Sequence, residues 1–195
     1  MTMKDDRRDA AIEAMADHLL THGLAGASLR PLARAAGTSD RMLLYYFGDK
    51  DRLLALTLDR IARRLTAILA AALPPGTRLG WAALLGAVWA GMADPALRPF
   101  MHLWLDLAAG AARGTEPQRR IAGAIADLFA AWLDERLDLP EGESTPAAHH
   151  LLAVIEGAML LDALGRPALA EAAIARAAAE ANVRPERPSP APPAG

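Results

Sequence analysis

Two arginines and a tyrosine stand close together in the first quarter of the chain, at Arg30, Arg41 and Tyr45. An arginine guanidinium can donate two hydrogen bonds to O6 and N7 of a guanine, so these residue types can read bases in DNA. Asp40 could accept a hydrogen bond from cytosine N4, or it could stabilise a helix N-terminus or orient Arg41. Arg41 could also contact only a phosphate, and it would then carry no sequence information.

Two short helices joined by a tight turn are predicted to position these side chains. Ser28 and Ser39 are suitable N-cap residues, because a serine hydroxyl can accept a hydrogen bond from a backbone N–H of the first turn. Gly37, between them, suits the left-handed conformation that often follows a helix end. Leu43 and Phe47 lie one turn apart on the second helix and should face the first. This pattern predicts a helix-turn-helix, in which the second helix enters the major groove of DNA.

The rest of the chain shows helical periodicity and no strand-like alternation, so we predict an all-α fold of about nine helices. Pro99 must either kink a helix or begin a new one. Three segments are expected: a DNA-binding domain at 1–48, a second helical domain at 49–182, and a tail at 183–195. The proline-rich tail is expected to be disordered, although it could be a ligand for a partner domain. Outside the helix-turn-helix, periodic runs predict helices over residues 5–22, 52–73, 81–92, 100–112, 115–137 (with Thr115 in a capping box), 145–164 and 167–181. Asp49 is a suitable N-cap for the helix that carries the run 52–73, with Asp51 in its first turn.

The composition of the 195 residues favours helices and excludes several kinds of site. Hydrophobic residues make up 53% and aromatic residues 5%, so alanine, the best helix former, accounts for much of the hydrophobic total. The chain has no cysteine and can therefore form neither disulfides nor thiolate metal sites. His18 and His22 are one turn apart, but without a third ligand nearby a solvated helix face is expected. We predict no metal and no cofactor.

The N-terminal residues are highly charged and lack the apolar region of a signal peptide, and no stretch approaches the ~20 apolar residues of a membrane span. We therefore expect a cytoplasmic protein with no membrane partner. The net charge of −2 argues mildly against a DNA-binding protein. Residues 28–50, however, hold four cations and two acids, a local charge of +2. Because salt screens charges beyond about 8–10 Å, this local balance permits DNA binding.

Residues 28–54 resemble the DNA-binding signature of the tetracycline-repressor (TetR) family of bacterial regulators. The matching features are Ser28, Arg30, Ala33, Ala36-Gly37, Ser39, Leu43, Tyr46-Phe47, Lys50 and Leu53-Leu54. The sequence departs from the family pattern at Pro31, where an acid is common, and at Asp40-Arg41 and Leu44-Tyr45, which replace a common Lys-Gly and Tyr-His. These are mostly positions expected to face DNA, so the departures concern the operator sequence rather than the mechanism.

The resemblance implies that Tyr46 and Lys50 contact DNA phosphates. A half-buried core position is the alternative for Tyr46, and both descriptions can hold together. Lys50 lies at the start of a long helix, whose free N–H groups attract anions. Base reading is expected from Arg41, Tyr45 and Arg30. The full set of residues predicted to contact DNA is Ser28, Arg30, Ser39, Asp40, Arg41, Met42, Leu44, Tyr45, Tyr46 and Lys50.

The resemblance also implies that the helices of residues 49–182 bind a small molecule and form a dimer. Large apolar side chains gather in the middle helices together with a few polar ones, which is typical of a small-molecule site. Ordinary core packing is the alternative for each of these residues. The candidate residues for binding an unknown effector are Trp89, Met92, Phe100, Met101, His102, Trp104, Asp106, Phe129 and His150.

The helix predicted at 145–164 is apolar on nearly all sides, because its residues 151–164 include only two charges. One face suffices for packing within the chain, so the surplus apolar surface indicates a partner. The last helix adds a stripe of mostly small residues that permits close approach. We predict a two-fold homodimer through these two helices. The predicted interface residues are Leu151, Val154, Ile155, Ala158, Leu161, Leu169, Ala170, Ala173, Ile174 and Ala177.

These observations predict a ligand-responsive transcriptional regulator that binds a (pseudo)palindromic operator in double-stranded DNA as a dimer. By resemblance to the family, repression is expected, with release of the operator when the effector binds. A ligand-independent architectural DNA-binding protein is the first alternative. An all-helical enzyme is the second, but the sequence shows no phosphate-binding loop, nucleophile elbow or paired metal-ligand motif. We therefore expect no enzymatic activity.

Overall fold

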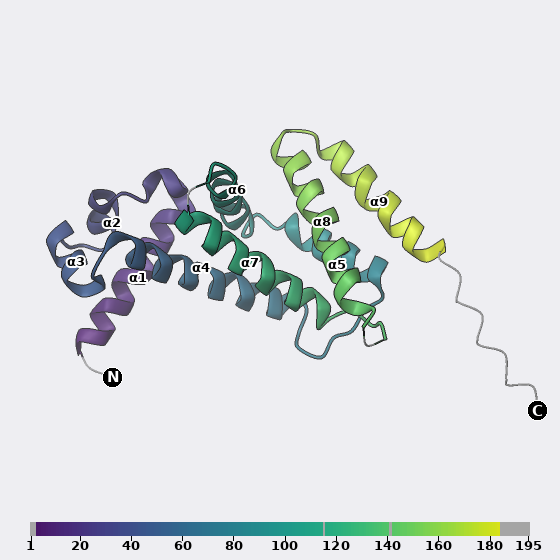
Figure 1. Ribbon diagram of the computed structural model, residues 1–195, viewed down its shortest axis with the longest axis horizontal. Coiled ribbons are helices and arrows are strands. Elements are labelled where there is room, and N and C mark those ends of the chain that lie inside the picture. The colour runs from purple at the N-terminus through teal and green to yellow at the C-terminus, as the bar shows by residue number, and fades with distance from the viewer. Residues whose placement is uncertain (1–2, 115, 141, 184–195) are drawn as a thin grey trace, which may run out of the picture. The chain divides into compact units, whose positions relative to one another are not determined.

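The computed structural model describes residues 3–114, 116–140 and 142–183 (Figure 1). Over these ranges the chain forms nine α-helices, one short 3₁₀ helix and no β-strand, which confirms the all-α prediction. The elements are α1 (Met3–His22), η1 (Leu24–Gly26), α2 (Leu29–Ala35), α3 (Asp40–Phe47), α4 (Lys50–Ala72), α5 (Trp81–Met92), α6 (Arg98–Ala112), α7 (Glu116–Asp134), α8 (Ser144–Ala163) and α9 (Pro167–Val183). None of the helices in this part of the chain is long and apolar enough to cross a membrane.

Helices α1, α2 and α3 pack with the long helix α4 around one apolar core (Figure 1). Met15 and Leu19 of α1, Leu43 and Phe47 of α3, and Leu53 of α4 are almost inaccessible to solvent. Pairs within one helix are four residues apart, so each helix buries a single face. Burying one such side chain stabilises the fold by roughly 1.5–3 kcal/mol. This shared core therefore fixes the orientation of α3.

Helix α6 packs against α1 and η1. Its inner face carries Phe100, Leu103 and Leu107, all of them buried. The helix begins at Arg98, so Pro99 stands in its first turn. A proline is tolerated there because the first-turn N–H groups have no partner within the helix. Pro99 therefore does not kink a helix but stands at the beginning of a new one, which is one of the two predicted outcomes.

Contacts divide the chain into two compact units. Unit 1 comprises the described residues up to Thr77 together with Ala90–Trp132, and unit 2 comprises Arg78–Trp89 together with the described residues from Leu133 onward. The division passes through α5 and α7 and differs from the predicted boundary after residue 48. The reason is that α4 buries Leu53, Leu58 and Ile61 in the core that it shares with α1 and α3. The domain limits 1–48, 49–182 and 183–195 stay predictions.

Unit 2 is built around the antiparallel pair α8 and α9, which Figure 1 shows joined by a short turn. Gly165 ends α8 with a φ of +72°, and its N–H donates to the carbonyl of Asp162 at 2.9 Å. Trp81 of α5 donates from Nε1 to the carbonyl of Ala147 at 3.0 Å. The ring of His150 stacks on Trp81 with centroids 5.0 Å apart. These contacts attach α5 to the start of α8.

Some predicted helix ends are wrong by a few residues. Helix α1 begins at Met3 rather than residue 5. Helix α4 begins at Lys50, and the prediction that Asp49 is its N-cap is confirmed. Helix α7 ends at Asp134 rather than 137, since Leu137 forms a parallel bridge with Leu79. Helix α9 continues to Val183, so the first residue of the predicted tail is helical. Thr115 and residues 184–195 lie outside the described residues.

Candidate nucleic-acid interface

The turn between α2 and α3 ends one helix and starts the next within four residues. Gly37 has a φ of +64°, in the left-handed region that was predicted for it. The N–H of Gly37 donates to the carbonyl of Arg34 at 3.1 Å, and that of Thr38 donates to Ala33 at 2.9 Å. These two bonds satisfy carbonyls that the end of α2 would otherwise leave free. These backbone hydrogen bonds hold the end of α2 in the turn.

The two predicted serine caps have different outcomes. The Ser39 hydroxyl accepts a hydrogen bond from the backbone N–H of Met42 at 3.3 Å, as predicted. The prediction that Ser28 occupies the N-cap position of α2 is confirmed, but the hydrogen bond expected from its hydroxyl is not made. Its carbonyl still accepts the first helical bond, from Leu32 at 3.2 Å. Helix α2 therefore depends more on burying Leu32 and Ala33 than on a side-chain cap.

Helix α3 has a buried and an exposed face. Leu43 and Phe47 enter the core, and the Arg8 guanidinium lies over the Phe47 ring, 5.4 Å from its centroid. Arg41 and Tyr45 are exposed on the opposite face, with 70% of Tyr45 accessible to solvent. Because they are four residues apart, they are neighbours on the helix surface. The face predicted to read bases is accessible.

The other residues predicted to contact DNA lie on α2, α3 and α4 or at their N-cap positions. All ten are exposed except Tyr46, which is half-buried and packs edge-on against Tyr45 with centroids 5.5 Å apart. Lys50 is the first residue of α4, next to Asp49, whose Oδ1 accepts from the backbone N–H of Arg52 at 2.7 Å. Arg30 lies in the first turn of α2. The predicted set thus combines exposed cations with the N-termini of α2, α3 and α4.

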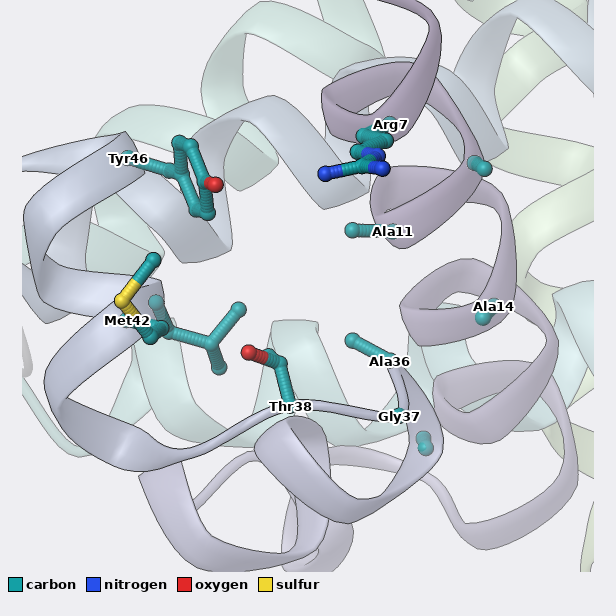
Figure 2. Close-up of a pocket in the computed structure, with 11 residues that line it drawn as sticks. Arg7, Ala11, Ala14, Ala36, Gly37, Thr38, Met42 and Tyr46 are labelled. Carbon is teal, nitrogen blue, oxygen red and sulfur yellow. The ribbon is translucent and has the colours of Figure 1, made fainter. Parts of the chain in front are cut away.

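A pocket of about 530 Å³ lies between α1, the α2–α3 turn and α3 (Figure 2). Its wall is largely formed by alanines. Figure 2 shows the Arg7 guanidinium and the Tyr46 hydroxyl directed into it from opposite sides, with the Thr38 hydroxyl also directed inward. Met42 lines the same pocket. Sequence reasoning missed Arg7, because α1 meets the turn only through the tertiary fold and no spacing in the sequence signals it. It also missed Thr38, although this residue directly precedes the predicted cap Ser39.

Ion pairs attach α1 to α4 beside this site. The Glu13 carboxylate pairs with both Arg60 and Arg64, and Asp17 Oδ1 lies 2.6 Å from Arg64 Nη1. Asp9 adds a longer pair with Arg60 at 3.8 Å. Hydrogen bonding to Arg64 lowers the pKa of Glu13, partial burial opposes this effect, and Arg60 lowers the pKa further. The network supports the charged state of Glu13 and holds α1 against α4.

Asp106 joins α6 to the end of α1. It is predicted to line an effector site, and the structure gives its carboxylate a backbone partner: Oδ2 accepts a hydrogen bond from the N–H of Leu24 at 2.9 Å. Gly23 has a φ of +64°, and a Cβ at this position would overlap the same oxygen. Glycine at residue 23 therefore suits the backbone conformation and leaves room for the Asp106 carboxylate at Leu24.

The remaining predicted effector residues are shared between the two units. Unit 2 holds Trp89 and His150, and unit 1 holds Met92, Phe100, Met101, His102, Trp104 and Phe129. Phe100 is buried, whereas His102 is exposed. The Phe129 ring stacks on Trp132 with centroids 5.6 Å apart. None of these residues lines the pocket of Figure 2, and the effector site stays a prediction.

The residues predicted to form a dimer interface lie on α8 and α9 but differ in accessibility. Leu151, Ile155, Ala158, Ala170 and Ile174 are buried within unit 2. Val154, Leu161 and Ala177 are half-buried, and Leu169 and Ala173 are exposed. Leu160 and Leu164 are also exposed although neither belongs to the predicted set. Periodicity could not separate the two groups, because the packing of α8 on α9 decides which face is used within the chain.

No group of three or more potential metal-ligating side chains occurs within the described ranges. His18 and His22 stack with ring centroids 4.3 Å apart, and His22 Nδ1 lies 3.0 Å from the His18 carbonyl. The pair packs against Gly26 of η1.

Comparisons with known proteins agree on the class of protein. Residues 9–57 match the model for bacterial regulatory proteins of the tetR family. The chain is 32% identical over 169 residues to the HTH-type transcriptional regulator BetI of Cronobacter sakazakii, covering 85% of this chain and 84% of the relative. It is 30% identical over 183 residues to BetI of Burkholderia mallei, covering 88% and 90% respectively.

Two crystal structures share the fold. A protein of Rhodococcus sp. described as a TetR-family transcriptional regulator superimposes with a TM-score of 0.68 at 21% identity, covering 92% of this chain and 98% of that one. A transcriptional regulator of Rhodococcus sp. Rha1 gives a TM-score of 0.67 at 26% identity, covering 92% and 95%. The likeness extends over almost the whole chain.

Proposed function

Because the chain belongs to the tetR family of bacterial regulatory proteins and is a transcriptional regulator, we propose that it represses its target genes as an operator-bound homodimer. In this proposal a small-molecule effector releases the dimer from a pseudopalindromic DNA operator in the cytoplasm. The observation that carries the proposal is the outer face of α3, where Arg41 and Tyr45 are exposed on a helix fixed by a buried opposite face.

Arg41 is the principal base-reading residue in this proposal. A guanidinium can donate to guanine O6 and N7 together, and such a bidentate contact is worth about 1–3 kcal/mol of discrimination between bases. Tyr45, one turn further along α3, and Arg30, at the start of α2, contact neighbouring positions. Asp40 lies in the first turn of α3, where a carboxylate interacts favourably with the helix dipole. We assign it that stabilising role.

Contacts with phosphates orient the protein on the duplex. We assign them to Lys50 and Tyr46, and we add Arg7 and Thr38 from the rim of the pocket in Figure 2. A guanidinium, an ammonium and two hydroxyls are all common donors to phosphate oxygens. The four residues come from α1, the α2–α3 turn, α3 and α4, so they surround the recognition helix on several sides.

Exposed leucines on α8 and α9 support the homodimer. Leu160, Leu164 and Leu169 leave large apolar surfaces in water, which is unfavourable unless a partner covers them. A two-fold axis would place the same surface of a second copy against them. The dimer presents two α3 helices to half-sites separated by a multiple of about 34–36 Å along the duplex.

The contact between Asp106 and Leu24 supports a route from the effector to α3. Helix α6 carries several predicted effector residues and is hydrogen-bonded to the corner where α1 ends. A displacement of α6 on effector binding would pull on Leu24 and tilt α1, against which α2 and α3 pack. Effector binding lowers the affinity for the operator, and because the coupling is reciprocal, operator binding lowers the affinity for the effector by the same factor. The coupling free energy is on the order of 1–3 kcal/mol.

Selection of binding sites from random duplex DNA by the purified full-length protein tests the proposal. We expect enrichment of a pseudopalindromic sequence whose half-sites are spaced by whole turns of the duplex. A protein with Arg41→Ala should lose preference at one position of each half-site. Recovery of unrelated sequences, with affinity for them equal to that for random DNA, would contradict operator recognition and favour an architectural role.

A further inference from the structure

The outer face of α3 is more apolar than contact with a phosphate backbone requires. Leu44 and Tyr45 are both exposed beside Arg41, and 36% of Leu44 is accessible. Leu44 follows Arg41 by three residues and Tyr45 follows it by four, so both are its neighbours on the helix surface. Arg41 is thus bordered by an aliphatic and an aromatic side chain on the face that the proposed function directs into the major groove.

Met42 is almost equally exposed, but its neighbour on this surface is Tyr45, three residues on, and not the adjacent Arg41. Its accessible fraction is 37%, and its side chain lines the pocket towards α1 together with Tyr46 (Figure 2). Leu44 does not line that pocket. Of the two exposed aliphatic residues of α3, only Leu44 is therefore a neighbour of Arg41.

We infer that Leu44 reads the 5-methyl group of a thymine close to the guanine bound by Arg41. The inference rests on the proposed operator binding and names one feature of the operator. A leucine side chain neither donates nor accepts hydrogen bonds. The thymine methyl is the apolar group that base pairs present in the major groove, so it is the group that a leucine there can recognise.

The spacing of the two side chains limits where the thymine lies. Cβ atoms three residues apart on a helix are about 5–6 Å apart, and base pairs are stacked about 3.4 Å apart. The thymine is therefore expected one or two base pairs from the guanine. Each half-site of the operator then contains a guanine and a nearby thymine in a constant arrangement.

Deoxyuridine substitution in the selected operator tests the inference, because uracil differs from thymine only in lacking the methyl group. At one thymine per half-site, we expect the substitution to weaken binding of the unaltered protein about fourfold, the equilibrium equivalent of burying one methyl group. The Leu44→Ala variant should bind the thymine and uracil operators with equal affinity. Titration of labelled duplexes at constant salt gives the ratio of dissociation constants for each protein.

Two control variants separate the local contact from a general effect. Met42→Ala removes an equally exposed side chain from α3, and Leu128→Ala removes one that is 52% exposed on α7. Both should keep the fourfold ratio between thymine and uracil, whatever their absolute affinity. Circular dichroism and thermal unfolding of each variant show whether it is folded.

The outcomes distinguish this inference from the proposed function. If selection yields no operator, operator recognition itself is contradicted. If an operator is bound but uracil is tolerated at every thymine near the guanine, thymine reading is wrong while operator binding stands. If the ratio persists in Leu44→Ala and disappears in Tyr45→Ala, the methyl group is read by the tyrosine and the assignment to Leu44 is overturned.

Discussion

Helix α3 and the α8–α9 pair both leave large apolar side chains in water, but their surroundings differ. On α3 the exposed Tyr45 and Leu44 stand beside Arg41, and Lys50 begins the next helix. On the α8–α9 pair, 64% of Leu164 is exposed, and α9 offers mainly alanines along its surface, where the exposed Arg176 pairs with Glu180. A face that combines apolar groups with cations suits DNA, which presents phosphates and thymine methyl groups. The leucines and alanines of the α8–α9 pair suit a second protein surface.

Each surface also has a different internal support. Unit 1 holds α1 against α4 with the ion pairs of Glu13, Arg60 and Arg64 in addition to its apolar core. The α8–α9 pair is held chiefly by buried aliphatic side chains such as Leu151 and Ile155. Exposure alone therefore does not identify a partner, because the charges near an exposed apolar side chain decide which partner fits.

Placing charge on the α8–α9 surface should have the largest effect. In Leu160→Glu/Leu164→Glu, the two glutamates of one copy would face those of the other across the proposed two-fold interface, so the proposed dimer should dissociate while each chain stays folded. Without the linked second half-site, operator binding should weaken at least about 100-fold. Native mass spectrometry and operator titration measure both results. Leu128→Glu, at an exposed position of α7, is the control, and persistence of the dimer in the double variant would contradict this interface.

Removing the guanidinium from α3 should have the next largest effect. Arg41→Ala should weaken binding to the selected operator by about 1–3 kcal/mol, since an alanine cannot donate the two hydrogen bonds to guanine. Affinity for random DNA should fall much less. Competition titrations with operator and random duplexes give the two values. An equal decrease for both duplexes would show that Arg41 binds phosphate and does not read a base.

Removing a cation from the phosphate backbone should have a smaller and uniform effect. Lys50→Ala should weaken operator and random DNA alike and reduce the slope of log K against log salt by about one unit for each phosphate that is no longer neutralised. The proposed dimer should be unaffected, because Lys50 is the first residue of α4 and lies outside the α8–α9 surface. Titrations at several salt concentrations provide the slope. An unchanged slope would remove Lys50 from the set of phosphate-binding residues.

Protonating Glu13, whose ion pairs hold α1 against α4, should have the smallest effect. The pKa of Glu13 lies below its ordinary value of 4.5, so its ion pairs stabilise the fold above that pH and are lost as the pH falls through the lower, folded-state pKa. The difference in Tm between the unaltered protein and Glu13→Gln should therefore narrow below pH 4.5. At neutral pH the two proteins should differ by no more than about 1 kcal/mol in their free energy of unfolding, because the ion pairs are partly exposed. Glu116→Gln, which removes an exposed pair within α7, should show little difference at any pH.

Local patterns predicted the helix-turn-helix well. Gly37 and Ser39 signalled a helix end and a helix start, and both adopt the expected conformation or hydrogen bond. The spacing of Leu43 and Phe47 identified the buried face of α3, and hence the exposed one. These features depend on residues within one or two turns of each other. Ser28 shows the limit even here, because its hydroxyl makes no cap bond although its position is the N-cap of α2.

By itself, then, the sequence determined that this chain is helical, where its recognition helix begins and which face of that helix is exposed. Only the tertiary structure decided that Asp106 binds the backbone of Leu24, that Arg7 shares a pocket with α3, and that Leu160 and Leu164 stay exposed while Leu151 does not. Helix caps and amphipathic faces follow from neighbours along the chain. Contacts across tens of residues depend on how helices pack, which no local spacing encodes.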